Sequence, residues 1–194
     1  MEKELTEPSI RAFVALSLSN EVMEVLTQKS LALQRQFADL NIRWVPFKNY
    51  HLTLSFIGNI PLHEIDRLET VVKKSISGFV TFTLTIGDII LFPPDQEVKG
   101  LFVADVVLEE PLEKLQAKIE ADLRAAGYKI YDRPYRPHIT IARLRKNRVG
   151  EEELTKGGFS LFSPVDHVHI YESHKENGIV VNSIVRSCPL DHEV

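Results

Sequence analysis

The stretch HLTLSFI, residues 51–57, decides the fold because polar and apolar residues alternate along it. Successive side chains of a β-strand point to opposite faces of the sheet. We therefore predict a strand here, with His51, Thr53 and Ser55 on one face. Phe56 is predicted on the other face, together with the two leucines of the stretch.

A second stretch, HITIARL at residues 138–144, has the same pattern. It predicts another strand, with His138 and Thr140 on one face and Arg143 on the opposite face. Each of these two strands follows an apolar strand and a helix, with the leading strands at about 10–18 and 101–108. Such an internal repeat sets the architecture of a chain. It predicts two lobes related by a pseudo-twofold axis, whose His-x-Thr faces meet in one cleft.

The remaining elements follow from hydrophobic spacing and from turn residues. Ser19 or Asn20 offers an N-cap for the first helix, Gly87 indicates a bulge and Gly127 a helix C-cap. The expected helices cover about 21–40, a stretch that begins at Pro61, and about 111–126. Further strands are expected at about 42–45, 80–92, 99–108, 165–172 and 179–186, with a turn at 93–95 and a charged connection over 146–158.

Composition describes an ordinary globular chain of 194 residues, 44% hydrophobic and 26% charged. This length suits one domain or two small lobes that share a boundary. The net charge of −4 argues against a protein that coats long nucleic acids. It favours a local basic pocket that binds the end of an RNA chain. Cys188 is the single cysteine, the first residues lack the apolar run of a signal peptide, and no run suits a membrane span. We expect a cytoplasmic monomer.

Each His-x-Thr pair places an imidazole beside a hydroxyl on one face of a strand. An imidazole gains or loses a proton near neutral pH, since its reference pKa is about 6.5. Two facing copies supply one group to remove a proton from a nucleophile and one to protonate a leaving oxygen. The hydroxyls supply uncharged donors to phosphate oxygens. The set suits in-line attack on phosphorus, above all in a strained 2′,3′-cyclic phosphate, whose leaving group is internal.

Other readings of these residues remain open. A single His-x-Thr is usually without function, and an inward histidine can belong to the core. Arg133, Arg136 and Arg143 are near the second motif and could pair with phosphate, although exposed charges contribute little. The aromatic residues that could stack on a base are Trp44, Tyr50, Phe56 and Tyr135, of which most are expected in the core.

Two rival functions follow from the same residues. The first is a nucleotide- or RNA-binding module that retains the pocket with little chemistry. The second is a metal hydrolase, because His167 and His169 share one strand face at a spacing that can bind a metal, although no third ligand is apparent.

The two motifs resemble those of the two-histidine phosphoesterase superfamily, and more narrowly those of the RNA 2′,3′-cyclic phosphodiesterases, also called 2′-5′ RNA ligases. The likeness rests on HLTLSFIG at residues 51–58 and RPHITIAR at residues 136–143. It extends over most of the chain, through RAFVA at 11–15, RWV at 43–45, YES at 171–173 and PL at 189–190.

The resemblance implies a bilobal α+β fold, with antiparallel sheets lining a central cleft and helices outside. It implies one domain over residues 1–194, with the repeat at about 10–58 and 101–144. It also implies hydrolysis of the 2′,3′-cyclic phosphate of RNA ends or nucleotides to a 2′-phosphate, with reversible 2′-5′ ligation.

By motif position, the resemblance makes His51 the proton donor and His138 the proton acceptor, with Thr53 and Thr140 binding phosphate. It implies no cofactor and no metal. Arg136, Arg143 and Tyr50 are additional candidates for substrate contacts.

Overall fold

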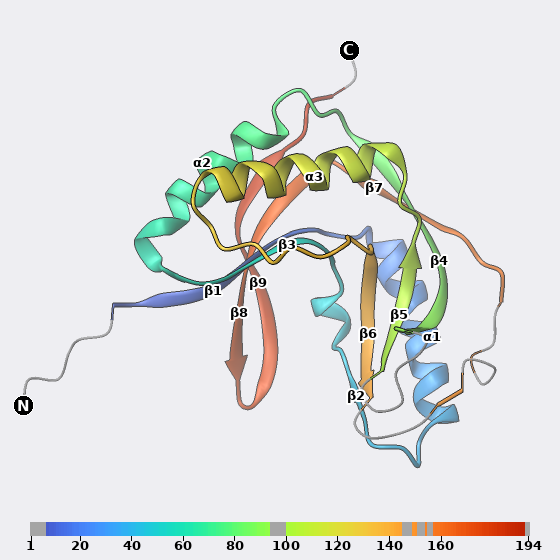
Figure 1. The fold of residues 1–194 in the computed structure, drawn as a ribbon. Coiled ribbons are helices and arrows are strands. Elements are labelled where there is room, and N and C mark those ends of the chain that lie inside the picture. Colours follow the sequence, from blue (N-terminus) through green and yellow to red (C-terminus); the bar gives the residue numbers. More distant parts are fainter. Residues whose placement is uncertain (1–6, 94–99, 145–148, 151–153, 155–156, 193–194) are drawn as a thin grey trace, which may run out of the picture.

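The computed structural model describes residues 7–93, 100–144, 149–150, 154 and 157–192 (Figure 1). Helices lie between most of the earlier strands along the chain, whereas the last three strands follow one another directly. Its elements are β1 (Ser9–Leu16), α1 (Asn20–Gln36), β2 (Ile42–Trp44), η1 (Phe47–Asn49), β3 (Leu52–Pro61), η2 (Leu62–Glu64), α2 (Ile65–Ile76), β4 (Phe82–Phe92), β5 (Leu101–Val106), α3 (Glu110–Ala125), β6 (His138–Leu144), β7 (Leu161–Val165), β8 (His167–Glu176) and β9 (Ile179–Pro189).

The strands form a curled antiparallel sheet in the order β7-β4-β5-β6-β3-β1-β8-β9, with β2 added beside β6. The order divides into two halves of four strands that meet where Leu52 of β3 pairs with Ile139 of β6. Each of these two residues directly follows the histidine of its motif. The junction of the two halves therefore lies at equivalent positions of the two motifs, as a pseudo-twofold axis requires.

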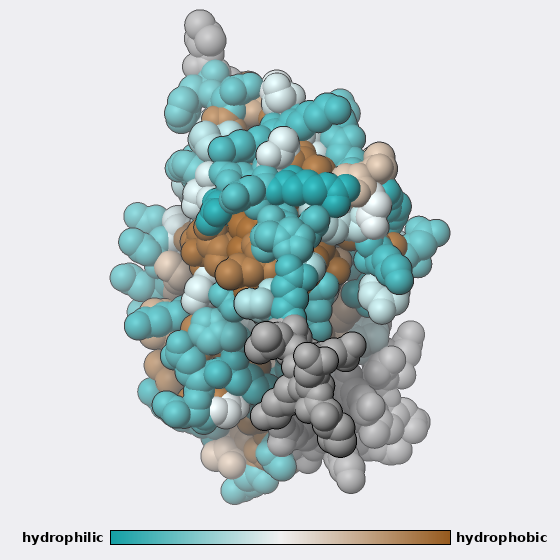
Figure 2. Space-filling view, turned by 90° about the vertical axis from the view of Figure 1, so that its left-hand side faces the viewer, coloured by the Kyte–Doolittle hydropathy of each residue, from teal (hydrophilic) through white to brown (hydrophobic). Residues whose placement is uncertain are grey.

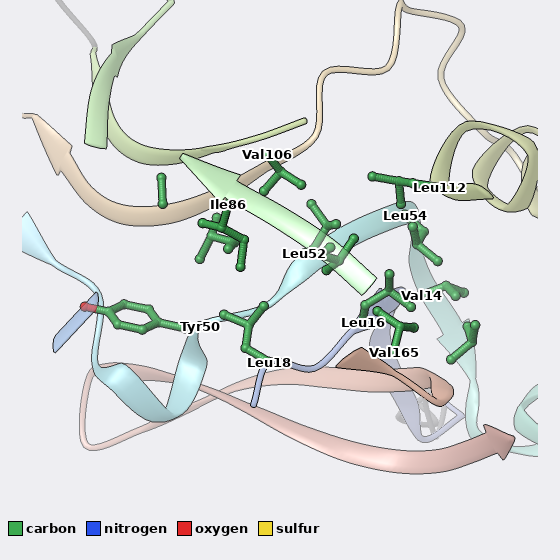
Figure 3. Packing of buried hydrophobic residues seen from close by; sticks show 14 of the residues in the cluster. Val14, Leu16, Leu18, Tyr50, Leu52, Leu54, Ile86, Val106, Leu112 and Val165 are labelled. Carbon is green, nitrogen blue, oxygen red and sulfur yellow. The ribbon is translucent and has the colours of Figure 1, made fainter. Parts of the chain in front are cut away.

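The helices pack on one face of this sheet. Helices α2 and α3 lie side by side over one half, whereas α1 lies over the other (Figure 1). Leu52 and Ile139 point into this side and are fully buried. Figure 3 shows Leu52 near Ile86 and Val106, and Leu16 near Val165, so that residues of both halves pack together. One core therefore continues beneath both halves and holds the junction in place by burial of apolar surface.

Local signals explain where two of the helices begin and end. The Ser19 Oγ accepts a hydrogen bond from the backbone N–H of Val22, so it caps α1. After α3, Gly127 has φ +90°, and the N–H of Tyr128 donates to the carbonyl of Leu123. This is a Schellman motif, which a residue with positive φ completes.

Several boundaries differ from the sequence-based expectation. Helix α1 ends at Gln36, and α2 begins at Ile65 after the short η2 turn. Strand β3 continues past Gly58, which adopts φ +89° opposite Ala12 and so keeps the strand paired. Strand β7 was not expected; it pairs with β4 and forms one edge of the sheet. The bulge at Gly87 is confirmed by a register shift between residues 86 and 89. Parts of the expected turn at 93–95 and connection at 146–158 lie outside the described residues.

The predicted face of Phe56 is wrong because β3 contains an extra residue. Thr53 pairs with Ala15 but Ser55 pairs with Val14, so Leu54 is inserted as a bulge. The carbonyl of Leu54 accepts a hydrogen bond from Gln116 of α3. Beyond the bulge, Ser55 turns into the core at 3% exposure, and Phe56 joins the histidine face at 48% exposure.

The predicted face of Arg143 is wrong for the same reason. In the β5–β6 pairing, Thr140 lies opposite Val103 and Ala142 opposite Phe102, so Ile141 is the extra residue. Arg143 therefore shares the face of His138 and Thr140. Both motif strands carry a bulge directly after their threonine, which places Phe56 and Arg143 at equivalent positions of the two halves.

Candidate active site

Both motif histidines are oriented by the same backbone contact. Nδ1 of His51 lies 2.7 Å from the carbonyl oxygen of Asn49, and Nδ1 of His138 lies 2.8 Å from that of Arg136. A carbonyl only accepts hydrogen bonds, so in both rings Nδ1 carries the hydrogen. Nε2 is then the atom of each ring that can exchange a proton with a substrate.

The strand register brings the two motifs together. Because Leu52 is opposite Ile139 in an antiparallel pair, continuing the register sets His51 opposite Thr140 and Thr53 opposite His138. All four side chains are half-buried. They lie on the face of the sheet away from the core, because Leu52 and Ile139, the residues next to them along the strands, point into the core. Opposite residues of a pair have Cβ atoms about 5 Å apart, so the four groups form one compact cluster.

Desolvation and nearby positive charge lower the pKa of both histidines. For His51 the largest cause is burial, followed by the charges of His138 and Arg143, while the carbonyl of Asn49 opposes the shift. For His138 burial again leads, the charges of Arg143 and Arg133 add to it, and the carbonyl of Arg136 and the carboxylate of Asp105 act against it. Each ring is therefore held toward the neutral form.

The surroundings of the two rings differ. His51 lies among aromatic side chains: its ring centroid is 4.8 Å from that of Phe13 and 5.7 Å from that of Tyr171. Phe13 stacks on Tyr171 at 5.1 Å and also contacts the exposed Phe56 at 6.0 Å. This aromatic wall leaves Phe56 as a flat, accessible surface beside His51.

His138 borders a hollow instead. Its ring stacks on Phe92 at 5.0 Å, and a cavity of about 320 Å³ opens beside it, lined in part by Asp105, Tyr135 and Arg136. The hydroxyl of Tyr135 donates to the backbone carbonyl of Thr53, 3.0 Å away. The loop before His138 is thereby tied to the other motif strand.

Among the other predicted contacts, Arg136 and Arg143 lie near the histidine pair, and the charge of Arg133 reaches His138. Tyr50 does not lie near the histidine pair. It is 4% exposed, its hydroxyl interacts with Ser30, and it lines a separate hollow beside α1. Trp44 packs on Phe102 in the core. The burial of Tyr50 leaves it unsuited to contact a substrate at the two histidines.

The paired histidines of β8 are engaged in a different way. Nε2 of His169 lies 3.1 Å from the Ser17 Oγ, and its Nδ1 lies 2.9 Å from the Ser187 Oγ. His167 stacks on His169 at 5.8 Å and contacts Asp166. Within the described ranges, no three His, Cys, Asp or Glu residues are grouped to hold a metal ion. Since both nitrogens of His169 already have partners, the structure gives no support to a metal site here.

Sequence reasoning missed Asn49. It is 7% exposed, and its side chain joins the turn before His51 to β9: Nδ2 donates to the carbonyl of Val180, and Oδ1 accepts from the N–H of Asn182. The signal was weak, because an asparagine beside a short turn is common on any surface.

The face of the molecule shown in Figure 2 is mostly hydrophilic, with a compact hydrophobic area near its middle. In the described part of the chain, the helices are all too short or too polar to cross a membrane.

Comparison with known proteins places this geometry in a family. The model of the 2′-5′ RNA ligase superfamily matches residues 23–177. An RNA 2′,3′-cyclic phosphodiesterase of Methanothermobacter thermautotrophicus is 26% identical over 139 residues, covering 72% of this chain and 73% of that protein. One from Bacillus subtilis is 27% identical over 143 residues, covering 69% and 75%.

Solved structures share the fold. The structure of E. coli LigT complexed with 3′-AMP has a TM-score of 0.77 at 22% identity, covering 94% of this chain and 99% of that one. A protein of Thermus thermophilus has a TM-score of 0.79 at 22% identity, covering 95% and 100%. Because the family model spans both motif strands and most of the described fold, the chain belongs to the 2′-5′ RNA ligase superfamily.

Proposed function

We propose that this protein hydrolyses the 2′,3′-cyclic phosphate of RNA ends to a 2′-phosphomonoester, without a metal. The observation that carries the proposal is the pair of imidazoles on one sheet face, each with Nδ1 bonded to a backbone carbonyl and Nε2 left for proton exchange. The similar proteins described as RNA 2′,3′-cyclic phosphodiesterases support it.

In the proposed reaction, neutral His138 accepts a proton from water at Nε2 while the water oxygen bonds to phosphorus. The bond from phosphorus to the 3′ oxygen breaks, and protonated His51 gives its Nε2 proton to that oxygen. Thr53 and Thr140 donate hydrogen bonds to the non-bridging oxygens. The products are a 2′-phosphate and a 3′-hydroxyl.

The environments of the two rings support this division of roles. Asp105, opposite His138 in the β5–β6 register, favours the protonated form that His138 reaches as it accepts the proton. Among its aromatic neighbours, His51 is desolvated, which makes its protonated form a readier donor. The same groups also suit ligation: a 5′-hydroxyl that attacks the cyclic phosphate in place of water gives its proton to His138, and the 3′ oxygen leaves with the proton of His51, which forms a 2′-5′ linkage. The reverse step cleaves that linkage and re-forms the cyclic phosphate.

The test is product analysis on a short oligoribonucleotide that ends in a 2′,3′-cyclic phosphate, in the presence of EDTA. We expect a 2′-phosphate end. His51→Ala and His138→Ala should each slow turnover by about 10²–10⁴-fold, the contribution of a positioned acid or base. His63→Ala is the matched control, because His63 is exposed and pairs with Glu7.

The outcomes separate the rival functions. A 3′-phosphate product, or near-full activity in either motif variant, contradicts the proposed chemistry. Tight binding of the oligonucleotide without turnover would indicate instead a binding module that retains the pocket. Loss of activity in EDTA would contradict metal independence.

A further inference from the structure

Three arginines from three strands converge near the histidine pair. Arg43 of β2 lies directly opposite Arg143 of β6. Arg143 shares the face of His138 because of the bulge at Ile141. Arg11 is two residues before Phe13 on β1 and so shares the face of the aromatic wall. Burial lowers the pKa of Arg143, and the positive charges of Arg43 and Arg11 lower it further, so both of these guanidiniums lie near that of Arg143.

This arrangement is costly in the absence of an anion. Like charges directly opposite each other on neighbouring strands destabilise a sheet. In the parts of the chain that the structure covers, no carboxylate forms an ion pair with any of these three arginines. By contrast, Arg67, Arg124 and Arg186 pair with Glu64, Glu120 and Glu69. The unpaired cluster therefore has the composition of a phosphate-binding site.

The cluster extends away from the histidines. Arg143 influences the pKa of both His51 and His138, so it lies beside the reacting position. Arg11 and Arg43 influence Arg143 but are not among the charges that shift either histidine. The register agrees with this: Arg43 is on β2, outside the two motif strands, and Arg11 is opposite Asn59, six residues past Thr53 on β3.

We propose that Arg11 and Arg43, together with Arg143, bind a second phosphate, the one on the 5′ side of the nucleotide that carries the cyclic phosphate. The inference rests on the proposed function and specifies its substrate. A bare nucleoside 2′,3′-cyclic phosphate lacks this group, whereas every RNA end has it as the next diester. A local positive cluster also reconciles a net charge of −4 with an anionic polymer substrate.

The experiment compares three substrates: adenosine 2′,3′-cyclic phosphate, the same nucleotide with a 5′-phosphate, and the dinucleotide ApA with a terminal cyclic phosphate. Wild-type kcat/KM should be higher for the last two. Arg11→Gln and Arg43→Gln should each lower kcat/KM for those two by about 10- to 100-fold, as expected for a charge-assisted hydrogen bond, and leave the bare nucleotide within about 2-fold. Arg124→Gln, on the outer helix α3, is the matched control.

The arms of the experiment distinguish a monoester from a diester. A response of the dinucleotide alone shows that the subsite takes an internal diester, and a response of both shows that it takes either form. Equal losses on all three substrates, or no loss on any, would overturn the proposal.

A binding arm separates this proposal from the proposed function. If the wild type turns over none of the three substrates, the hydrolytic function fails, but binding of a fluorescent adenylate trinucleotide with a 2′-phosphate end still tests the subsite. The slope of log affinity against log salt should fall by about 0.7 for each arginine removed, the value for one phosphate contact on a single strand. An unchanged slope rejects the subsite.

Discussion

At the scale of single residues, Asn49 is the candidate for positioning His51. Its backbone carbonyl orients His51, and its buried side chain fixes that backbone to β9 through Val180 and Asn182. We expect Asn49→Ala to lower the free energy of unfolding by about 1–3 kcal/mol, since it leaves buried partners unsatisfied. Asn49→Ala should also lower kcat about 10-fold with little change in KM. Asn182→Ala, which removes a side chain but retains the backbone donor, is the control; equal kcat in both variants would contradict the positioning role.

Burial is the largest cause of the lowered pKa of both motif histidines, and the charge of Arg143 adds to it. This positive charge disfavours a second positive charge nearby and lowers the pKa of His51 and of His138. Removing that charge in Arg143→Gln should raise both pKa values, so both limbs of the bell-shaped pH profile of kcat/KM should move to higher pH. The profile is to be measured on the bare cyclic nucleotide. Limbs that stay in place, or move to lower pH, would show that Arg143 does not act on the pair through its charge.

The sequence predicted that the two motif histidines share one face of the sheet, but not which residues position them. His51 and His138 were found because each His-x-Thr occurs at the same place of a repeated unit, and the structure brings both onto one face. Asn49 and the hydrogen-bonded His169 gave no comparable signal, since their roles depend on partners more than 100 positions away in the chain. Tyr50 stood beside a motif, but the backbone turns its ring toward α1.

At the level of single elements, the motif strands and the bulge at Gly87 were predictable, but the bulges that follow the two motif threonines were not. Alternation identified the motif strands because one face is buried throughout. One inserted residue then reversed the alternation after each threonine and carried Phe56 and Arg143 to the histidine face. A bulge depends on pairing with a neighbouring strand, so a single strand's sequence cannot reveal it when apolar residues such as Leu54 fill the extra position.

The C-terminus of α3 allows a prediction confined to one element. Gly127 has φ +90° and ample space around its Cα, so a methyl group there meets backbone strain but no clash. We expect Gly127→Ala to lower the free energy of unfolding by about 1 kcal/mol, the cost of a side chain in the left-handed region. Activity should be retained, because α3 packs on the core face. Gly157→Ala, at ordinary backbone angles, is the control, and equal stability of the two variants would contradict the assignment of the cap.

At the scale of the whole molecule, each half of the sheet starts at the β3–β6 junction with a motif strand followed by the leading strand of its repeat unit. These are β3 and then β1 in one half, and β6 and then β5 in the other. We propose that each half is built around one copy of the internal repeat, β1 with β3 and β5 with β6, and that the two halves act as one domain over a continuous core. The repeat could be predicted because the same succession of a strand, a helix and a strand with His-x-Thr occurs twice along the sequence. Two features could not be predicted: the edge strand β7, and the position of α1, which contacts β7 and so lies over the half of the sheet that does not contain β1. Both depend on long-range packing.

The whole molecule also couples its stability to pH through His169. Burial, and then the charge of His167, lowers the pKa of this ring, which is 8% exposed. The unfolded chain therefore takes up a proton near pH 6.5 that the folded chain takes up only at lower pH. Stability is fully present above pH 6.5 and is lost as the pH falls toward the lowered pKa, at up to about 1.4 kcal/mol per pH unit for this histidine. Urea unfolding of the wild type from pH 7.5 to 5.5 should show this loss, and His169→Gln should flatten it while His63→Gln, at an exposed site, should not. An identical pH dependence in the wild type and in His169→Gln would mean that this buried imidazole does not link protonation to folding.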